Sequence, residues 1–209
     1  MKKFLISVIA VTILSLTAFA QDNQYGVGAV YNSASAQESR QSAGGFAYVI
    51  YNRDINKQKV TFENTFFVFN NGVVPNPEGR VVQNDFKFRT DLNGLSWDFG
   101  LDKNTAQVYA TGLASVSNQQ GRTQFNAGLG VGFRFNDNSF VEYHYIPPVG
   151  ATQYQGHRFT AEHYHYLNSS QNYYTRVGVT GNIAKFNPVP TQQQDIANAI
   201  FFVGFGKRY

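Results

Sequence analysis

The residues best suited to catalysis lie between Glu162 and Ser170, in the segment Glu-His-Tyr-His-Tyr-Leu-Asn-Ser-Ser. A histidine that contacts a hydroxyl nucleophile and an orienting acid can support acyl transfer, because the ring accepts the proton as the nucleophile attacks. Strand alternation places Glu162 on one face and both His163 and His165 on the other, so these sequence neighbours are not neighbours in space. Ser169 follows in an expected short turn. The two histidines could also bind a metal, but no third ligand is evident. We therefore expect no catalytic residue, no metal and no cofactor.

The element that must position such residues is a β-strand, and its clearest example runs from Phe125 to Phe135. Every odd position in this run is apolar, whereas the even positions are Asn126, three glycines and Arg134. Because successive side chains of a strand point to opposite faces, one surface is apolar and the other polar. About eleven residues, tilted by roughly 45°, also suffice to cross the hydrocarbon of a bilayer. The pattern suggests a wall with lipid outside and a polar lumen inside.

Similar alternation recurs along most of the chain. Eleven candidate strands can be counted, at 25–31, 45–51, 60–69, 81–89, 95–101, 106–116, 124–135, 141–145, 158–166, 173–183 and 200–209. Turn signals such as Asp91-Leu92-Asn93-Gly94 separate them, and none of the intervening stretches has helical periodicity over a useful length. The fold class is therefore all-β.

The connections help to count the strands. Long connections are expected at 33–43, 147–156 and 185–198, and short ones at 53–58, 136–138 and 168–171, but this alternation loses its phase between about residues 80 and 123. Single-chain bacterial barrels have an even number of strands. We therefore predict that two segments there form one bulged strand, or that one segment lies in a loop. The prediction is a closed antiparallel up-and-down transmembrane β-barrel of about ten strands, with eight or twelve as alternatives.

The start of the chain has the features of an export signal. Lys2 and Lys3 precede an uncharged apolar run that ends near Leu16, and Ala18-Phe19-Ala20 forms a cleavage motif. We expect residues 1–20 to be a signal peptide and residues 21–209 to form the barrel domain. Without the two lysines, 15 basic residues remain against 13 acidic ones, a balance that does not indicate a nucleic-acid partner. Cysteine is absent, which excludes disulfides and thiolate chemistry.

The last residues, from Phe201 to Tyr209, carry the most specific motif. Tyr209 is a terminal aromatic residue, and Gly204 lies six positions from the end, counting Tyr209 as the first. In these features, with Phe205 between them, the chain resembles the bacterial outer-membrane β-barrel superfamily, particularly its small OmpA, OmpX and OmpW types. Lys207 departs from the apolar residue usual at its position. The resemblance implies a Gram-negative outer-membrane location among lipids and lipopolysaccharide, and recognition of the last strand by the barrel-assembly machinery.

If the apolar faces point outward, ten charged residues line the lumen. These are Asp85, Lys87, Arg89, Asp98, Arg134, Glu142, Arg158, Glu162, Arg176 and Arg208. A narrow barrel has room for little more than its own side chains, so these charges must pair or meet trapped water. A structural network that fills the barrel is the favoured interpretation. The alternative is a narrow, porin-like, anion-favouring pore lined by the surplus arginines.

The function expected is that of a non-enzymatic outer-membrane barrel with a structural or narrow passive-channel role, whose extracellular loops could be adhesive. One alternative is an enzyme of the same architecture, because the histidine and serine segment loosely resembles that of lipid A deacylases, although their His-x-Ser-Asn order is missing. Another is a soluble lipocalin-like binder, with its apolar residues inside and its charges outside. The oligomeric state stays open.

Overall fold

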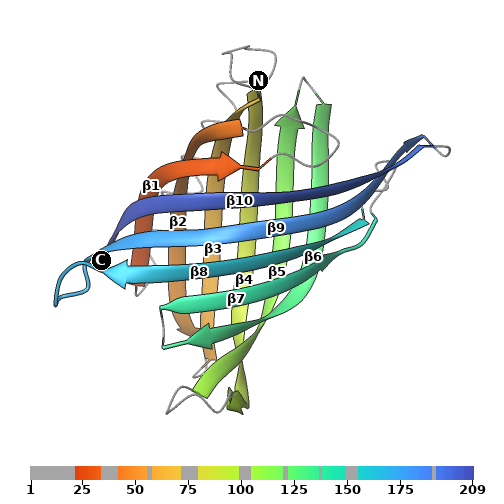
Figure 1. Ribbon diagram of the computed structural model, residues 1–209. Helices are drawn as coiled ribbons and strands as arrows, with labels where there is room; N and C mark the ends of the chain where they lie inside the picture. The colour runs from red at the N-terminus through yellow and green to blue at the C-terminus, as the bar shows by residue number, and fades with distance from the viewer. Residues whose placement is uncertain are drawn as a thin grey trace.

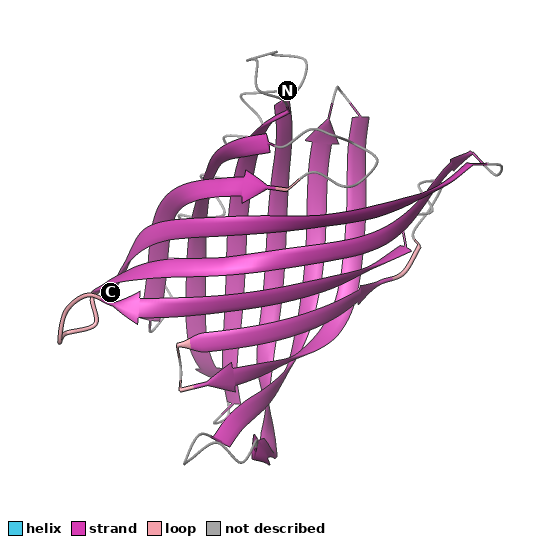
Figure 2. Ribbon diagram, viewed as in Figure 1, coloured by secondary structure: helices cyan, strands magenta, loops and turns pink. Residues whose placement is uncertain are grey.

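The computed structural model describes residues 22–33, 42–55, 58–71, 80–98, 105–119, 122–136, 138–148, 155–189 and 192–209. The expected signal peptide lies outside these ranges. All regular elements of the described part are strands (Figure 2). No helix among the described residues is long and apolar enough to cross a membrane.

Ten antiparallel strands form one closed barrel in which each strand pairs with its neighbours in sequence and β1 pairs with β10 (Figure 1). The strands are β1 (Asp22–Asn32), β2 (Ser42–Ile55), β3 (Gln58–Asn71), β4 (Arg80–Asp98), β5 (Thr105–Gln119), β6 (Arg122–Phe135), β7 (Ser139–Ile146), β8 (Gln155–Tyr166), β9 (Tyr173–Val189) and β10 (Gln192–Arg208). The prediction of an all-β, closed, up-and-down barrel of ten strands is confirmed. Closure leaves no open sheet edge, so the ladder satisfies the backbone polar groups of every strand.

The two chain termini of the barrel meet at one end of it. The backbone N–H of Tyr209 donates to the carbonyl of Asn23 over 2.9 Å, beside the start of β1. We call this the termini end; β2, β4, β6 and β8 also end there, because each strand runs antiparallel to its neighbours.

The eleventh candidate strand disappears into β4. Candidates 81–89 and 95–101 belong largely to one strand, whose pairing with β5 shifts between Asp91 and Ser96. There β4 advances by five positions while β5 moves by two, so three extra residues bulge from the ladder. The expected turn at 91–94 is therefore wrong: the Asn-Gly signal marks this irregularity, and the alternative of one long bulged strand is confirmed.

The long connection expected at 185–198 is also wrong. β9 continues to Val189 and β10 begins at Gln192, with Lys185 opposite Asp195. Figure 1 shows this hairpin extending past the start of β8, where Gln155 lies opposite Lys185. A strand ladder is built from backbone hydrogen bonds, so the polar, weakly alternating sequence there did not prevent strand formation.

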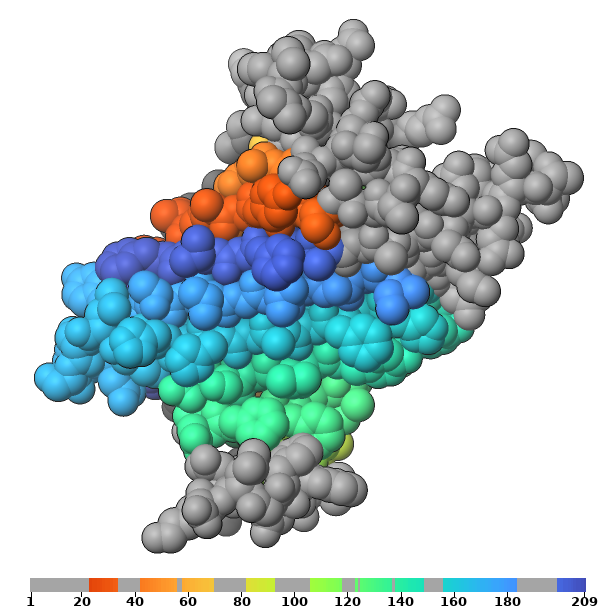
Figure 3. All heavy atoms as spheres, in the orientation of Figure 1, coloured from red at the N-terminus to blue at the C-terminus, as the bar shows by residue number. Residues whose placement is uncertain are grey.

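The outer face of the barrel is apolar and the inner face polar. On β6, Leu129 is 79% exposed and Phe125 is 50% exposed, whereas Gly128 and Gly132 are buried. Phe201, Val203 and Phe205 line the outer face of β10, and each is at least half exposed. In Figure 3 the side chains of β7 to β10 form a continuous surface over the front of the barrel.

Candidate functional site

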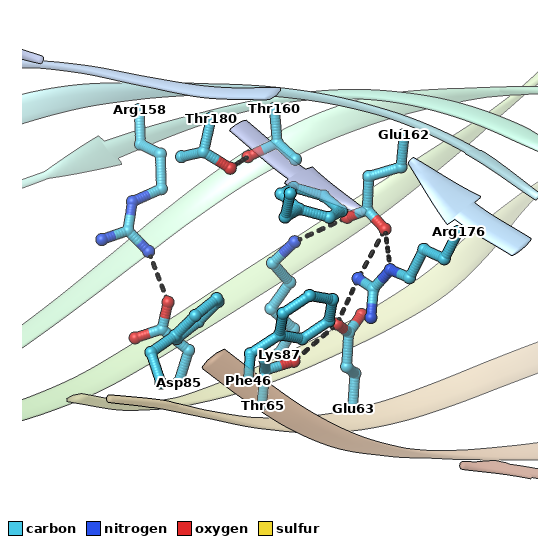
Figure 4. Close-up of a pocket in the computed structure, with 12 residues that line it drawn as sticks. Phe46, Glu63, Thr65, Asp85, Lys87, Arg158, Thr160, Glu162, Arg176 and Thr180 are labelled. Carbon is cyan, nitrogen blue, oxygen red and sulfur yellow. Dashed lines mark hydrogen bonds and ion pairs between the residues drawn. The ribbon is translucent and has the colours of Figure 1, made fainter. Parts of the chain in front are cut away.

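A network of six charged side chains crosses the middle of the barrel, and we call it the central ionic network. Arg176 donates to Glu63 over 2.6 Å and to Glu162 over 2.5 Å, which joins β9 to β3 across the lumen. Figure 4 shows these three side chains converging, with the Lys87 amine also directed at Glu162. The full membership is Glu63, Lys87, Arg89, Glu142, Glu162 and Arg176.

The charges of the network are balanced and almost fully buried. Lys87 lies 3.0 Å from both Glu142 and Glu162, and Arg89 pairs with Glu63, Glu142 and Glu162. The side chains of the two latter glutamates have no exposed surface. An unpaired ion would lose several kcal/mol on such burial, so three carboxylates against three cations is the arrangement that burial requires.

Two further ion pairs line the lumen, one on each side of the network. Arg158 lies 3.0 Å from Asp85, which also accepts a hydrogen bond from Ser115 over 2.6 Å, as Figure 4 shows for the ion pair. Toward the termini end, Arg134 lies 2.7 Å from Asp91. The described ion pairs therefore join five carboxylates to five cations.

Aromatic rings enclose the network. The Arg176 guanidinium lies over the rings of Tyr48, Tyr164 and Phe202, at 4.6, 5.5 and 5.4 Å from their centroids. The Tyr109 hydroxyl donates to Glu142 over 3.1 Å. Such contacts stabilise a desolvated cation through the ring quadrupole and fill the space between the charged groups.

Inward glycines make room for these rings. A Cβ at Gly132 would overlap the ring of Tyr109, and one at Gly178 would overlap the ring of Phe202. Tyr48 and Tyr174 lie in the same way over Gly206. The space left by the missing side chains is thus filled by aromatic rings from neighbouring strands, an arrangement known to stabilise glycine in sheets.

The structure brings eight of the ten residues expected in the lumen into these ion pairs, and Arg208 lines a cavity at the termini end. Asp98 pairs through its backbone with Thr105, and its side chain lies outside the described residues. Two members of the pairs were missed in the sequence, Glu63 and Asp91. Glu63 faces inward, but the polar Asn64 interrupts the apolar residues of the outward face and so obscures the alternation in the sequence. Asp91 was assigned to a turn. With both included, the surplus of basic residues seen in the sequence is matched within the described pairs.

The central ionic network separates two cavities. One, of about 30 Å³, lies on the side of Asp85 and Arg158 and is bordered by Lys87, Glu162 and Arg176. The other, of about 350 Å³, is the termini-end cavity, and Arg89, Phe140 and Tyr164 form its inner wall. The smaller cavity holds about one water molecule, so the lumen is filled there by side chains.

The histidine and serine segment does not assemble a triad among the described residues. His163 faces outward and its Nδ1 lies 2.9 Å from the hydroxyl of Ser139, while Glu162 points into the lumen and binds Arg176. His165 is exposed on the same outer face, and Ser169 is exposed in the β8–β9 turn. Within the described ranges no group of three or more histidine, aspartate or glutamate side chains is placed to hold a metal ion.

The C-terminal residues close the seam between β1 and β10. Gly204 faces inward opposite Gly28, and Phe205 faces outward opposite Val27. The Tyr209 ring stacks on Tyr25 with 5.4 Å between centroids. The terminal aromatic residue is thus part of the outer surface at the termini end.

No protein-family model matches the chain, and no curated protein matches it either. The closed ten-strand antiparallel barrel is compatible with a small barrel fold.

Proposed function

We propose that the protein is an integral outer-membrane β-barrel with a structural role in the envelope, closed across its middle by the central ionic network. The observation that carries this proposal is the distribution of polarity: apolar side chains outside and paired charges inside. A soluble barrel requires the opposite arrangement, because its exterior faces water and its interior is the hydrophobic core.

The outer surface supports membrane residence. Large apolar side chains are exposed on the outer faces of β1, β3, β4, β6, β7, β8, β9 and β10, among them Val27, Phe62, Phe86, Leu129, Val141, Phe159, Val177 and Val203. Contiguous apolar surface of this extent is costly in water and favourable in lipid. The proposed neighbours are outer-membrane lipids and lipopolysaccharide, with the last strand presented to the barrel-assembly machinery.

The filled interior favours a closed barrel rather than a passive channel. The network joins β3 and β4 to β7, β8 and β9, so its side chains occupy the section through which a solute would pass. The pairs of Lys87 and Arg89 with Glu142 and Glu162, and the pair of Arg176 with Glu63, link strands that are not neighbours in the sheet. A lipid-modifying activity has no assembled catalytic group to support it among the described residues.

Cell fractionation tests the proposal. The full chain, expressed in a Gram-negative host, is expected to float with outer-membrane fractions and to migrate faster on detergent gels before heating than after heating. A soluble periplasmic protein of the same host serves as the fractionation control. Recovery of the folded chain in the soluble periplasm would refute membrane residence.

Lipid A mass spectrometry distinguishes the proposed structural role from the enzymatic alternative. Envelopes with and without the protein are expected to show the same acylation pattern. Loss of an acyl chain only in the presence of the protein would favour the hydrolase.

A further inference from the structure

The termini-end cavity is lined by several cationic side chains, which closing the barrel does not require. Its volume of about 350 Å³ lies within the range of small-molecule sites. Cationic side chains reach it from four strands: Lys59 from β3, Arg89 from β4, Arg134 from β6 and Arg208 from β10. None of the described residues that line it is acidic.

The carboxylates that pair with two of these cations lie behind the wall. Arg89 binds Glu63, Glu142 and Glu162, and Arg134 binds Asp91, but none of these four carboxylates lines the cavity. The cavity is therefore lined by the cation of each ion pair and not by its carboxylate. A guanidinium has five N–H donors, of which the three carboxylate contacts of Arg89 use three, and its planar fork matches phosphate oxygens.

The remaining wall offers neutral polar groups and rings. Side-chain amides come from Gln24, Asn52, Asn136, Asn138 and Gln171, and aromatic surface comes from Tyr164 and Tyr166. Amides bond to hydroxyl groups as donors and as acceptors, and ring faces pack against the C–H surface of a sugar. These groups suit a ligand that carries hydroxyls as well as a negative charge.

The rim of the cavity shows an independent irregularity. Asn136 and Gln171 line the cavity and are the non-glycine residues of the described chain with positive φ, at 50° and 56°. Such conformations are unfavourable for side chains with a Cβ, glutamine more so than asparagine, and they concentrate at functional sites. Both residues are exposed at the termini end.

We propose that the termini-end cavity binds a small phosphate ester of about the size of a sugar phosphate. The arginine and lysine side chains would hold the phosphate, and the amides and tyrosine rings would contact the sugar. This binding does not depend on membrane residence, because the cavity belongs to the folded barrel itself.

Titration calorimetry on the full folded barrel in detergent micelles tests the proposal with three probes: glucose 6-phosphate, inorganic phosphate and glucose. We expect the strongest binding for glucose 6-phosphate, weaker binding for phosphate and none for glucose. Equal binding of phosphate and its ester would overturn the sugar contacts, and equal binding of glucose and its phosphate would overturn the role of the cations. Absence of binding by all three would overturn the site and leave the proposed function standing.

The matched variants lie side by side on β10. Arg208→Gln removes a cation of the cavity, whereas Lys207→Gln removes the neighbouring cation on the outer face. A charge-assisted hydrogen bond contributes enough for a loss of about tenfold or more in affinity, so we expect that loss for Arg208→Gln and less than a twofold change for Lys207→Gln. Lys59→Gln, at the opposite wall, provides a second test should Arg208→Gln fail to fold, and faster migration on unheated gels reports the fold of each variant. Equal affinity of the cavity variants and Lys207→Gln would refute the proposal.

Discussion

Single buried charges organise the interior because each of them is shared. Glu63 accepts from Arg176 over 2.6 Å and lies 2.9 Å from Arg89, so one carboxylate from β3 holds cations from β9 and β4. Removal of one member leaves the other buried charges unbalanced, which costs more than the pair itself contributes. The contribution of a buried charged residue to stability therefore depends on its partners.

Arg176→Met leaves Glu63 and Glu162 without a principal partner. We expect the free energy of unfolding to fall by about 3–5 kcal/mol, measured by urea unfolding of the refolded barrel. Arg53→Met, at an exposed position of β2, is the control and should change it by about 0.5 kcal/mol or less. Equal effects of the two substitutions would contradict a buried network.

Gly132→Ala places a methyl group against the Tyr109 ring, which is buried and hydrogen-bonded to Glu142. Overpacking of this kind costs about 1–3 kcal/mol of unfolding free energy. At Gly181 an added Cβ meets nothing within 4 Å, so Gly181→Ala is expected to be neutral or stabilising. Urea unfolding of both variants measures the difference, and a neutral Gly132→Ala would show that the ring does not need the glycine.

At the scale of the strand, the two faces lie in different surroundings. The outer face of β6 carries Phe125, Leu129 and Val131, and its inner face carries the glycines opposite β7. The ends of a strand lie near the membrane interface in the proposed arrangement, and its centre lies in hydrocarbon. A charge placed along one face therefore reports on the surroundings of the barrel.

Leu129→Arg puts a cation at the centre of the outer face of β6. In lipid vesicles we expect a loss of about 2–4 kcal/mol in unfolding free energy, against about 0–1 kcal/mol for Thr123→Arg near the strand end on the same face. In a soluble barrel both positions are ordinary surface, and each change would stay within about 0.5 kcal/mol. Equal small effects would thus refute the proposed bilayer location.

The seam between β1 and β10 gives a second prediction for the strands. Tyr209→Ala removes the ring that stacks on Tyr25, and we expect a loss of about 0.5–1.5 kcal/mol in unfolding free energy beyond that of the lost area. Tyr209→Phe keeps the stacked ring and should retain most of the stability. If the two variants lose the same amount, the hydroxyl and not the ring stabilises the seam.

For the whole molecule, the proposed closure of the barrel rests on the central ionic network. It lies between the two cavities and joins opposite walls, so the lumen is interrupted at one section. A pair of substitutions that removes one cation and one carboxylate keeps the charge balance while it removes side-chain volume from that section.

Arg89→Ala/Glu142→Ala removes such a pair. We expect no steady ion conductance of the native barrel in planar bilayers and measurable conductance of the double variant. Arg53→Ala/Asp54→Ala, which removes two exposed charges from β2, should stay closed. Steady conductance of the native protein would favour the passive channel over the closed barrel.

The sequence by itself determined the period of two, the polarity of each strand face and the approximate strand number, because these depend on local alternation. It located the irregularity between residues 80 and 123 from connection lengths, but not its form: Asp91 belongs to a bulged β4 because pairing with β5 outweighs a local turn signal. It also missed the polar hairpin of β9 and β10, since ladder hydrogen bonds come from the backbone.

Only the tertiary structure decided which charges meet. Glu63 and Arg176 are far apart in sequence, and their contact exists because the sheet closes and brings β3 opposite β9. Closure also places aromatic rings against the inward glycines, so the space that these residues leave is filled. Alternation is a property of neighbours along the chain, whereas charge pairing and packing in a narrow lumen depend on strands that meet only across the barrel.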